Sequence, residues 1–211
     1  MKTFKTFIAS SLGGDFRSCR SQIASMLSDM SSDSDLYMDF SSYRFEADDF
    51  NAATFLGAQA EINRSIDSSH AFILICDDNV GVKTIEEFRY ALNRLWKGLN
   101  PYYITILKKK GVGVVSNEHR ISFKDFEDKY VKFYYYHEDG NVGDDMYVYK
   151  YDYDDEEDML LHLKDNLKRW ILNSNHRPLF KAEMGRDITP SFLYPKNSDR
   201  IANCHDNVYF R

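Results

Sequence analysis

The sequence predicts an α/β fold, with a central parallel sheet covered by helices on both faces. Two observations support this class. Short apolar runs of strand length alternate with longer segments in which apolar residues recur every three or four positions, as on one face of a helix. The connections between these segments are short, which is typical of right-handed β-α-β units and therefore of a parallel sheet.

The predicted elements follow one another through the first half of the chain. Four apolar runs are predicted to be strands, at residues 5–10, 36–40, 70–76 and 102–107. The run at 70–76 is continuously apolar, as expected of a central strand. Helical patterns lie between the runs, at residues 15–30, 52–66 and 85–97. Thr84 is predicted to cap the last of these helices and Gly98 to end it.

Three loops are expected to carry any binding site. In parallel sheets, ligands bind beyond the carboxyl ends of the strands. The loops at that edge are predicted at residues 10–15, 41–49 and 77–84.

The composition excludes several classes of protein. Apolar residues make up 43% of the 211 residues and charged residues 28%, which allows a proper core and argues against global disorder. The net charge of −6 is unfavourable for general nucleic-acid binding. The one basic run, Lys108-Lys109-Lys110, follows a predicted strand, and we interpret it as a solvated strand end in preference to a phosphate site.

The cysteines and the N-terminus bear on location. Cys19, Cys76 and Cys204 are far apart and form no CxxC pair, which argues against a zinc site and a disulfide framework. The Asp48-Asp49 pair has no further ligand at a spacing suited to a metal, so no metal is predicted. No signal peptide or membrane span is recognisable, and we therefore expect a cytoplasmic protein.

The second half of the chain is rich in tyrosine. Segments 133–136 and 146–153 are strand candidates, and the turn signals between them make a hairpin plausible. Tyrosines alternate through the second segment and would share one face of a strand. We favour a half-buried strand over a base-stacking surface, because neighbouring aspartates would repel a nucleic-acid backbone. A helix is predicted at 154–172, with an acidic first turn and basic residues near its end.

The character of the sequence changes after Asn173. Pro178, Pro190 and Pro195 interrupt a polar stretch without a sustained helix or strand pattern. We therefore predict a domain at residues 1–175, followed at 176–211 by a linker or the start of a further domain in a longer protein.

Three short motifs resemble the TIR superfamily. They are the strand and turn Phe7-Ile8-Ala9-Ser10-Ser11, the strand Phe72-Ile73-Leu74-Ile75, and the helix start Thr84-Ile85-Glu86-Glu87-Phe88. The order of elements agrees over residues 4–172, and the likeness is closest to bacterial TIR-like domains at the N-terminus of anti-phage defence proteins. The resemblance implies a flavodoxin-like, TIR-like sheet. The segment 111–130 and the tyrosine-rich region depart from a minimal TIR domain.

The resemblance also implies functional residues. Glu87, followed by an apolar residue, matches the glutamate that cleaves NAD in that family, and Glu86 is the alternative one position earlier. Ser10 and Ser11 would line the same pocket. Residues 43–45 would cover it, and Tyr43 or Phe45 could stack on a flat ring. NAD would be the substrate, and no cofactor is implied.

A structural role competes with catalysis for Glu87. Thr84 and Glu87 have the spacing of a capping box, in which the glutamate bonds back to the cap amide. In the catalytic interpretation, the helix dipole would keep the carboxylate ionised, so that it could stabilise the positive charge that develops on the ribose.

Three functions remain open. The first is an NAD glycohydrolase or cyclase of anti-phage immunity, activated by oligomerisation. It would self-associate with other TIR domains and be joined to a C-terminal sensor or NTPase domain. The second is a non-catalytic TIR interaction module. The third is an enzyme similar to nucleoside deoxyribosyltransferases, which also place a glutamate near a ribose.

Overall fold

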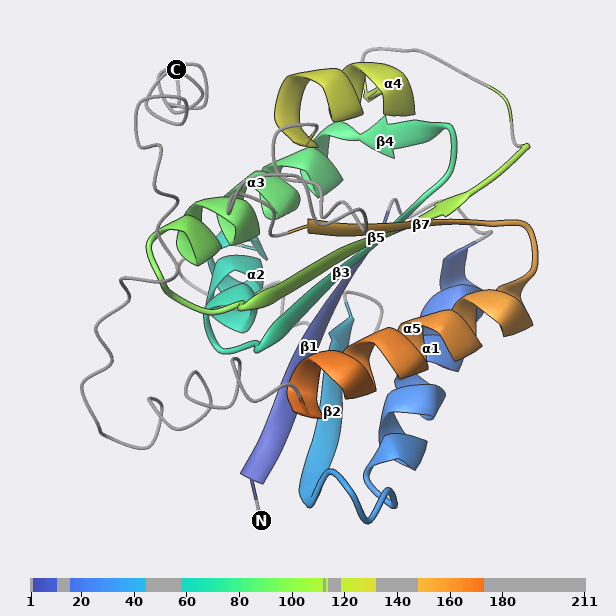
Figure 1. Cartoon of the computed structure of the whole chain (residues 1–211). Coiled ribbons are helices and arrows are strands. Elements are labelled where there is room, and N and C mark those ends of the chain that lie inside the picture. The colour runs from blue at the N-terminus through green and yellow to red at the C-terminus, as the bar shows by residue number, and fades with distance from the viewer. Residues whose placement is uncertain are drawn as a thin grey trace, which may run out of the picture.

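A five-stranded parallel sheet forms the centre of the computed structural model (Figure 1), which describes residues 2–10, 16–44, 58–111, 113, 119–131 and 148–172. The strand order is β2-β1-β3-β5-β7, and every neighbouring pair is parallel. The strands are β1 (Lys2–Ser10), β2 (Met38–Arg44), β3 (Ala71–Cys76), β5 (Tyr103–Lys109) and β7 (Val148–Tyr153). The predicted α/β class with a parallel sheet is confirmed.

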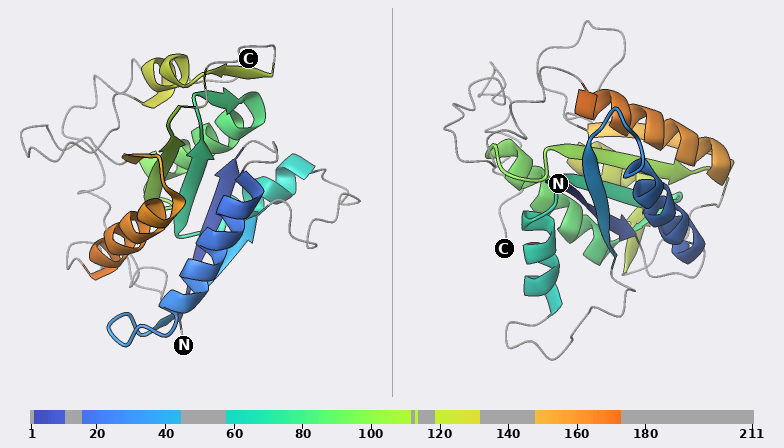
Figure 2. Two further views of the ribbon diagram at one scale, coloured as in Figure 1. Left: turned by 90° about the vertical axis from the view of Figure 1, so that its right-hand side faces the viewer. Right: turned by 90° about the horizontal axis from the view of Figure 1, so that it is seen from below.

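Helices cover both faces of this sheet (Figure 2). On one face, α1 (Phe16–Met30) and α5 (Glu156–Leu172) bury their apolar sides in one core cluster. On the other face, α2 (Ala58–Asp67) and α3 (Val82–Trp96) contribute to a second cluster. All six residues of β3 are buried, as predicted for the central strand. Among the described residues, no helix is long and apolar enough to cross a membrane.

A small unit that the sequence did not predict lies beside α3. The strands β4 (Asn79–Gly81) and β6 (Arg120–Ser122) pair antiparallel. The strand β6 is followed by the short helix α4 (Phe123–Phe126) and a π-helical turn, η1 (Glu127–Val131). Phe126 is fully buried, and its ring lies edge-on to Phe88 of α3 with 5.2 Å between centroids. This unit therefore extends the core over the start of α3.

The second strand is longer than predicted. Its residues pair with β1 from Lys2 opposite Met38 to Ile8 opposite Arg44. Residues 41–44 consequently belong to β2, and the assignment of a loop from residue 41 is wrong there. Residues 41–44 are mostly polar and show no strand pattern by themselves. They form a strand because they pair with the long first strand.

The third helix begins earlier than predicted. It starts at Val82 with Gly81 as its N-cap, and no side chain bonds the cap. The Val82 amide donates instead to the carbonyl of His119, at 3.0 Å. The proposed capping box of Thr84 and Glu87 is therefore wrong. Thr84 is buried inside the first helical turn.

The tyrosine-rich segment supplies the last strand of the sheet. β7 runs parallel to β5, and its Tyr149 and Tyr151 are half-buried while Tyr153 is fully buried. All three belong to the core between the sheet and α5. The prediction of a half-buried strand is confirmed, and residues 133–136 of the expected hairpin lie outside the described residues.

Candidate functional site

The strand order places a topological switch point between β1 and β3. The chain leaves β1 through α1 to β2 on one side, and then crosses through α2 to β3 on the other. Connections that diverge in this way leave a crevice beyond the carboxyl ends of the two strands, where parallel α/β folds bind ligands. Ser10 ends β1 opposite Ile75, next to the end of β3. The structure therefore places Ser10 at this edge.

A buried arginine holds Ser10. Arg20 of α1 is 2% exposed, and its Nη1 donates a hydrogen bond to the Ser10 hydroxyl. The sequence interpretation missed this residue. A signal was present, because Arg20 lies four residues after Phe16 and three before Ile23 and thus on the apolar face of α1. A charged residue at such a position is buried only when it is held by polar partners.

Glu87 lies in the second turn of α3, where it is half-buried. Burial, reinforced by the charge of Glu86, raises the pKa of its carboxyl group to about 7, and Lys83 opposes this shift. The expectation that the helix dipole keeps the group ionised is not met, since burial outweighs a dipole effect that fades after the first turn. Among the described residues, Glu87 has no hydrogen-bond or ion-pair partner.

The face of α3 that carries Glu87 is directed toward α2. Three and seven residues later, Tyr90 and Arg94 both contact Asp67 at the end of α2, the tyrosine hydroxyl at 2.8 Å and the guanidinium at 2.9 Å. Residues at this spacing share one helix face. Glu87 is therefore on the α2 side of its helix.

Glu86 has a different environment. Its carboxylate forms an ion pair with Lys83 at 2.8 Å, and its side chain is 40% exposed. A solvated pair of this kind is typical of a helix surface. Glu87 has a raised pKa, whereas Glu86 is paired with Lys83, so Glu87 is the better candidate for a catalytic carboxylate.

Tyr43 is packed into the sheet face that also carries α3. Its ring stacks on Phe7 with 5.3 Å between centroids, and Phe7 stacks in turn on Phe72 at 5.6 Å. Phe72 meets Phe88 edge-on at 6.3 Å. A row of aromatic rings thus connects Tyr43 to the residue that follows Glu87. Ser11 and Phe45, the other predicted pocket residues, lie outside the described residues.

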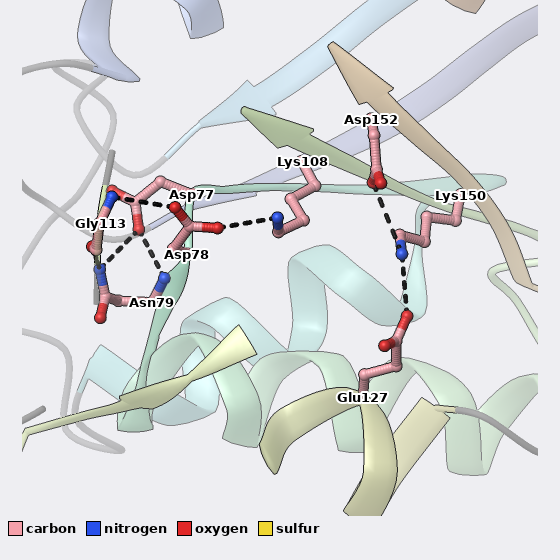
Figure 3. Close-up of polar contacts among 8 residues, drawn as sticks. All are labelled: Asp77, Asp78, Asn79, Lys108, Gly113, Glu127, Lys150 and Asp152. Atoms are coloured by element: carbon pink, nitrogen blue, oxygen red, sulfur yellow. Dashed lines mark hydrogen bonds and ion pairs between the residues drawn. The ribbon is translucent and has the colours of Figure 1, made fainter. Parts of the chain in front are cut away.

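Two groups of polar contacts lie near the carboxyl ends of β3, β5 and β7, one around Asp78 and one around Lys150 (Figure 3). We call the two groups together the strand-end network, which comprises Asp77, Asp78, Asn79, Lys108, Gly113, Glu127, Lys150 and Asp152. The sequence interpretation did not identify it. Residues 77–79 are adjacent in sequence, but their partners on β5 and after it, and the group around Lys150, come from distant parts of the chain that the fold brings to this edge.

The part of the network at β3 fixes a turn. Asp77 accepts hydrogen bonds from the Asn79 amide at 2.7 Å and from its side chain at 3.2 Å. The Asn79 side chain also donates to the carbonyl of Gly113 at 2.9 Å. The Asp78 carboxylate accepts from the Gly113 amide at 2.9 Å and pairs with Lys108 at 2.8 Å. The polar side chains of this turn therefore bond both within the turn and to residues on and after β5.

Each lysine of the basic run has a carboxylate partner. Lys108 pairs with Asp78, and this partner raises its pKa although burial opposes the change. Lys109 lies 3.7 Å from Glu156, and Lys110 lies 3.0 Å from Asp154. The ion pairs give no support to a phosphate site. They also show that Lys108 is held in a network instead of being freely solvated.

No thiol or metal chemistry is evident in the described part of the chain. Cys19 and Cys76 are buried and free, and burial raises the pKa of both thiols, that of Cys19 to about 11. Both are consequently unreactive near neutral pH. The described residues contain no group of three or more His, Cys, Asp or Glu side chains arranged for a metal ion. Cys204 and the Asp48-Asp49 pair lie outside these residues.

Comparison of the chain with protein families, curated proteins and solved structures gives no match. The functional assignment therefore depends on the geometry of the site and on the motifs described above.

Proposed function

We propose that this protein is a TIR-like enzyme that cleaves the bond between nicotinamide and ribose in NAD, with Glu87 as the catalytic carboxylate. The observation that carries the proposal is the environment of Glu87. A glutamate without a polar partner in the described structure lies on α3, the helix that follows β3 and the short β4, and its pKa is near 7. Perturbed carboxyl groups near the ends of parallel strands are typical of functional sites.

The chemistry needs an anion beside the ribose. As the C–N bond breaks, the electron pair leaves with nicotinamide, which departs as a neutral molecule, and positive charge develops on the ribose. Water then adds to the ribose and releases a proton, giving ADP-ribose. If an adenine nitrogen attacks instead, the product is cyclic. Ionised Glu87 would stabilise the cation, and binding of the positively charged nicotinamide ring would favour that ionised form.

Other residues would support this reaction. The Ser10 hydroxyl, which accepts a hydrogen bond from Arg20, would bond a ribose or phosphate oxygen at the switch point. Tyr43 has one ring face on Phe7, so it would act mainly by shaping the pocket. We infer no cofactor, because NAD itself is the substrate.

The test measures the release of nicotinamide from NAD by chromatography. It compares the wild type with the variants Glu87→Gln and Glu86→Gln. We expect Glu87→Gln to abolish release and Glu86→Gln, the matched neighbour, to retain it. The reverse result would move the catalytic role by one residue. Full activity in both variants, or none in the wild type under any condition, would refute the proposal and leave an interaction module or a nucleoside-modifying enzyme. Base exchange between nucleosides would identify the latter.

The setting that we propose is a cytoplasmic effector of anti-phage defence that is activated when copies self-associate. An unregulated NAD-consuming enzyme would harm its own cell, and clustering by an attached sensor or NTPase domain would supply control by raising the local concentration. Turnover per molecule should therefore rise with protein concentration. A constant value over a wide dilution series would count against this control.

A further inference from the structure

The start of α3 is held by residues distant in sequence. Gly81, its N-cap, offers no side chain, and the first helical amide bonds to the His119 carbonyl. Pairing of β4 with β6 holds the three residues that precede the helix. The crossover between β5 and β7 therefore restrains the start of α3, one turn before Glu87.

Asp78 connects the parts of this arrangement (Figure 3). One carboxylate oxygen pairs with Lys108 of β5 at 2.8 Å, and the other accepts the Gly113 amide at 2.9 Å. Its backbone carbonyl accepts the amide of Phe123, the first residue of α4, at 2.8 Å. A single residue four positions before α3 thus contacts the sheet, the segment after β5 and the covering helix.

A second route leads from the same ion pair to the neighbour of Glu87. The Lys108 ammonium lies 5.2 Å from the centre of the Phe123 ring. Phe123 packs on Phe126 with 5.8 Å between centroids, and Phe126 packs on Phe88 at 5.2 Å. A change at the Asp78–Lys108 pair would therefore reach α3 through packed rings as well as through the backbone.

We propose that Asp78 is a positioning residue that holds the start of α3, and through it the carboxylate of Glu87, in the orientation needed for cleavage of NAD. This inference rests on the proposed function. Asp78 need not touch the substrate. Its contribution is geometric, since a displacement of a catalytic group by about 1 Å can reduce the rate about 100-fold.

The test compares Asp78→Ala with Asp154→Ala. Asp154 is a matched control because it also pairs with a lysine at the end of β5, Lys110 at 3.0 Å, but is not part of the strand-end network. We expect Asp78→Ala to lower kcat at least about tenfold and to change KM less than about threefold. Asp154→Ala should change neither. Asp78→Asn keeps an acceptor for Gly113 but loses the charge, and should give an intermediate kcat.

Amide hydrogen exchange provides a measurement that does not depend on activity. Exchange at residues 82–88 should accelerate in Asp78→Ala and not in Asp154→Ala. Unchanged kcat in both Asp78 variants, an equal loss in Asp154→Ala, or a loss of kcat without faster exchange would overturn the proposal. If Asp78→Ala does not fold, Asp78→Asn decides by the same criteria. If the wild type releases no nicotinamide, the proposed function fails, while faster exchange would still establish the restraint on α3.

Discussion

The guanidinium of Arg20 donates a hydrogen bond to the hydroxyl of Ser10 at the carboxyl end of β1. Both residues are removed from bulk water to different degrees: Arg20 is 2% exposed and Ser10 is half-buried. The bond joins the first helix to the edge of the sheet at the switch point. It therefore links the stability of the fold to the geometry of the proposed NAD site.

We predict that Arg20→Ala lowers the free energy of unfolding by about 2–4 kcal/mol, because it leaves a cavity and removes a hydrogen bond to Ser10. Ser10→Ala should cost about 1–3 kcal/mol, since a buried charged donor loses an acceptor. Urea unfolding measures both values. Arg17→Ala provides the control, because Arg17 lies on the same helix but is exposed. Equal effects of Arg17→Ala and Arg20→Ala would show that the Ser10 contact contributes nothing.

The activity should depend on pH through Glu87. The proposed reaction needs the ionised carboxylate, and the pKa of this group is about 7 in the free protein. We therefore expect kcat/KM for NAD cleavage to rise with pH and to reach half of its plateau near pH 7. The matched variant is Lys83→Met, which removes the cation that lowers this pKa and should move the midpoint upward. A midpoint near 4.5 in the wild type would show that the half-buried environment of Glu87 does not raise its pKa.

The stability of the fold should respond to pH in the opposite direction. The folded pKa of Glu87 is about 7 against an ordinary value of 4.5, so the native state binds more protons than the unfolded state between these values. Stability therefore falls as pH rises through this window, and the full penalty applies above pH 7. Glu87→Gln cannot ionise, and above pH 7 it should be more stable than the wild type by up to about 3 kcal/mol.

Denaturant unfolding of Glu87→Gln at pH 4.5 and pH 8 measures this effect. The two proteins should be nearly equal at the lower pH and should diverge at the higher one. Glu86→Gln serves as the control, because Glu86 is solvated and paired with Lys83. A variant Glu87→Gln that is less stable than the wild type at pH 8 would mean that the carboxylate is held by favourable contacts.

The elements with strong local patterns could be predicted from the sequence. The apolar run at 71–76 became the central strand, and the helical pattern at 15–30 became α1, with one buried apolar face. The start of the third helix could not be predicted in this way. Its first amide bonds to His119, which is 37 residues later in the chain, and the local Thr84 signal was misleading.

The candidate site, too, could be predicted only where the signal was local in sequence. Two short motifs pointed to Ser10 and Glu87, but neither motif contained the environment of its residue. The raised pKa of Glu87 depends on burial by neighbouring elements, and the strand-end network depends on strands that are adjacent only in space. Local dipole reasoning consequently gave the wrong protonation behaviour for Glu87, because tertiary burial was the larger effect.

The last prediction concerns the C-terminal boundary of the domain. The helix α5 buries five side chains in the core that it shares with α1, namely Met159, Leu163, Leu167, Trp170 and Ile171. Truncation before Asp158 removes all of them, at about 2–5 kcal/mol for each large apolar side chain. Their sum exceeds the total stability of a typical domain, so this truncated chain should not fold.

Truncation after Asn175 leaves α5 intact, and the sequence after it has three prolines and no sustained amphipathic pattern. We therefore expect the melting temperature to change by less than about 2 °C. Thermal unfolding followed by circular dichroism compares the full chain with the two truncated forms. The alternative is that the apolar residues Phe180, Phe192 and Leu193 anchor the tail to the domain. A loss of several degrees on cutting at Asn175 would place them in the domain and would move its boundary beyond residue 175.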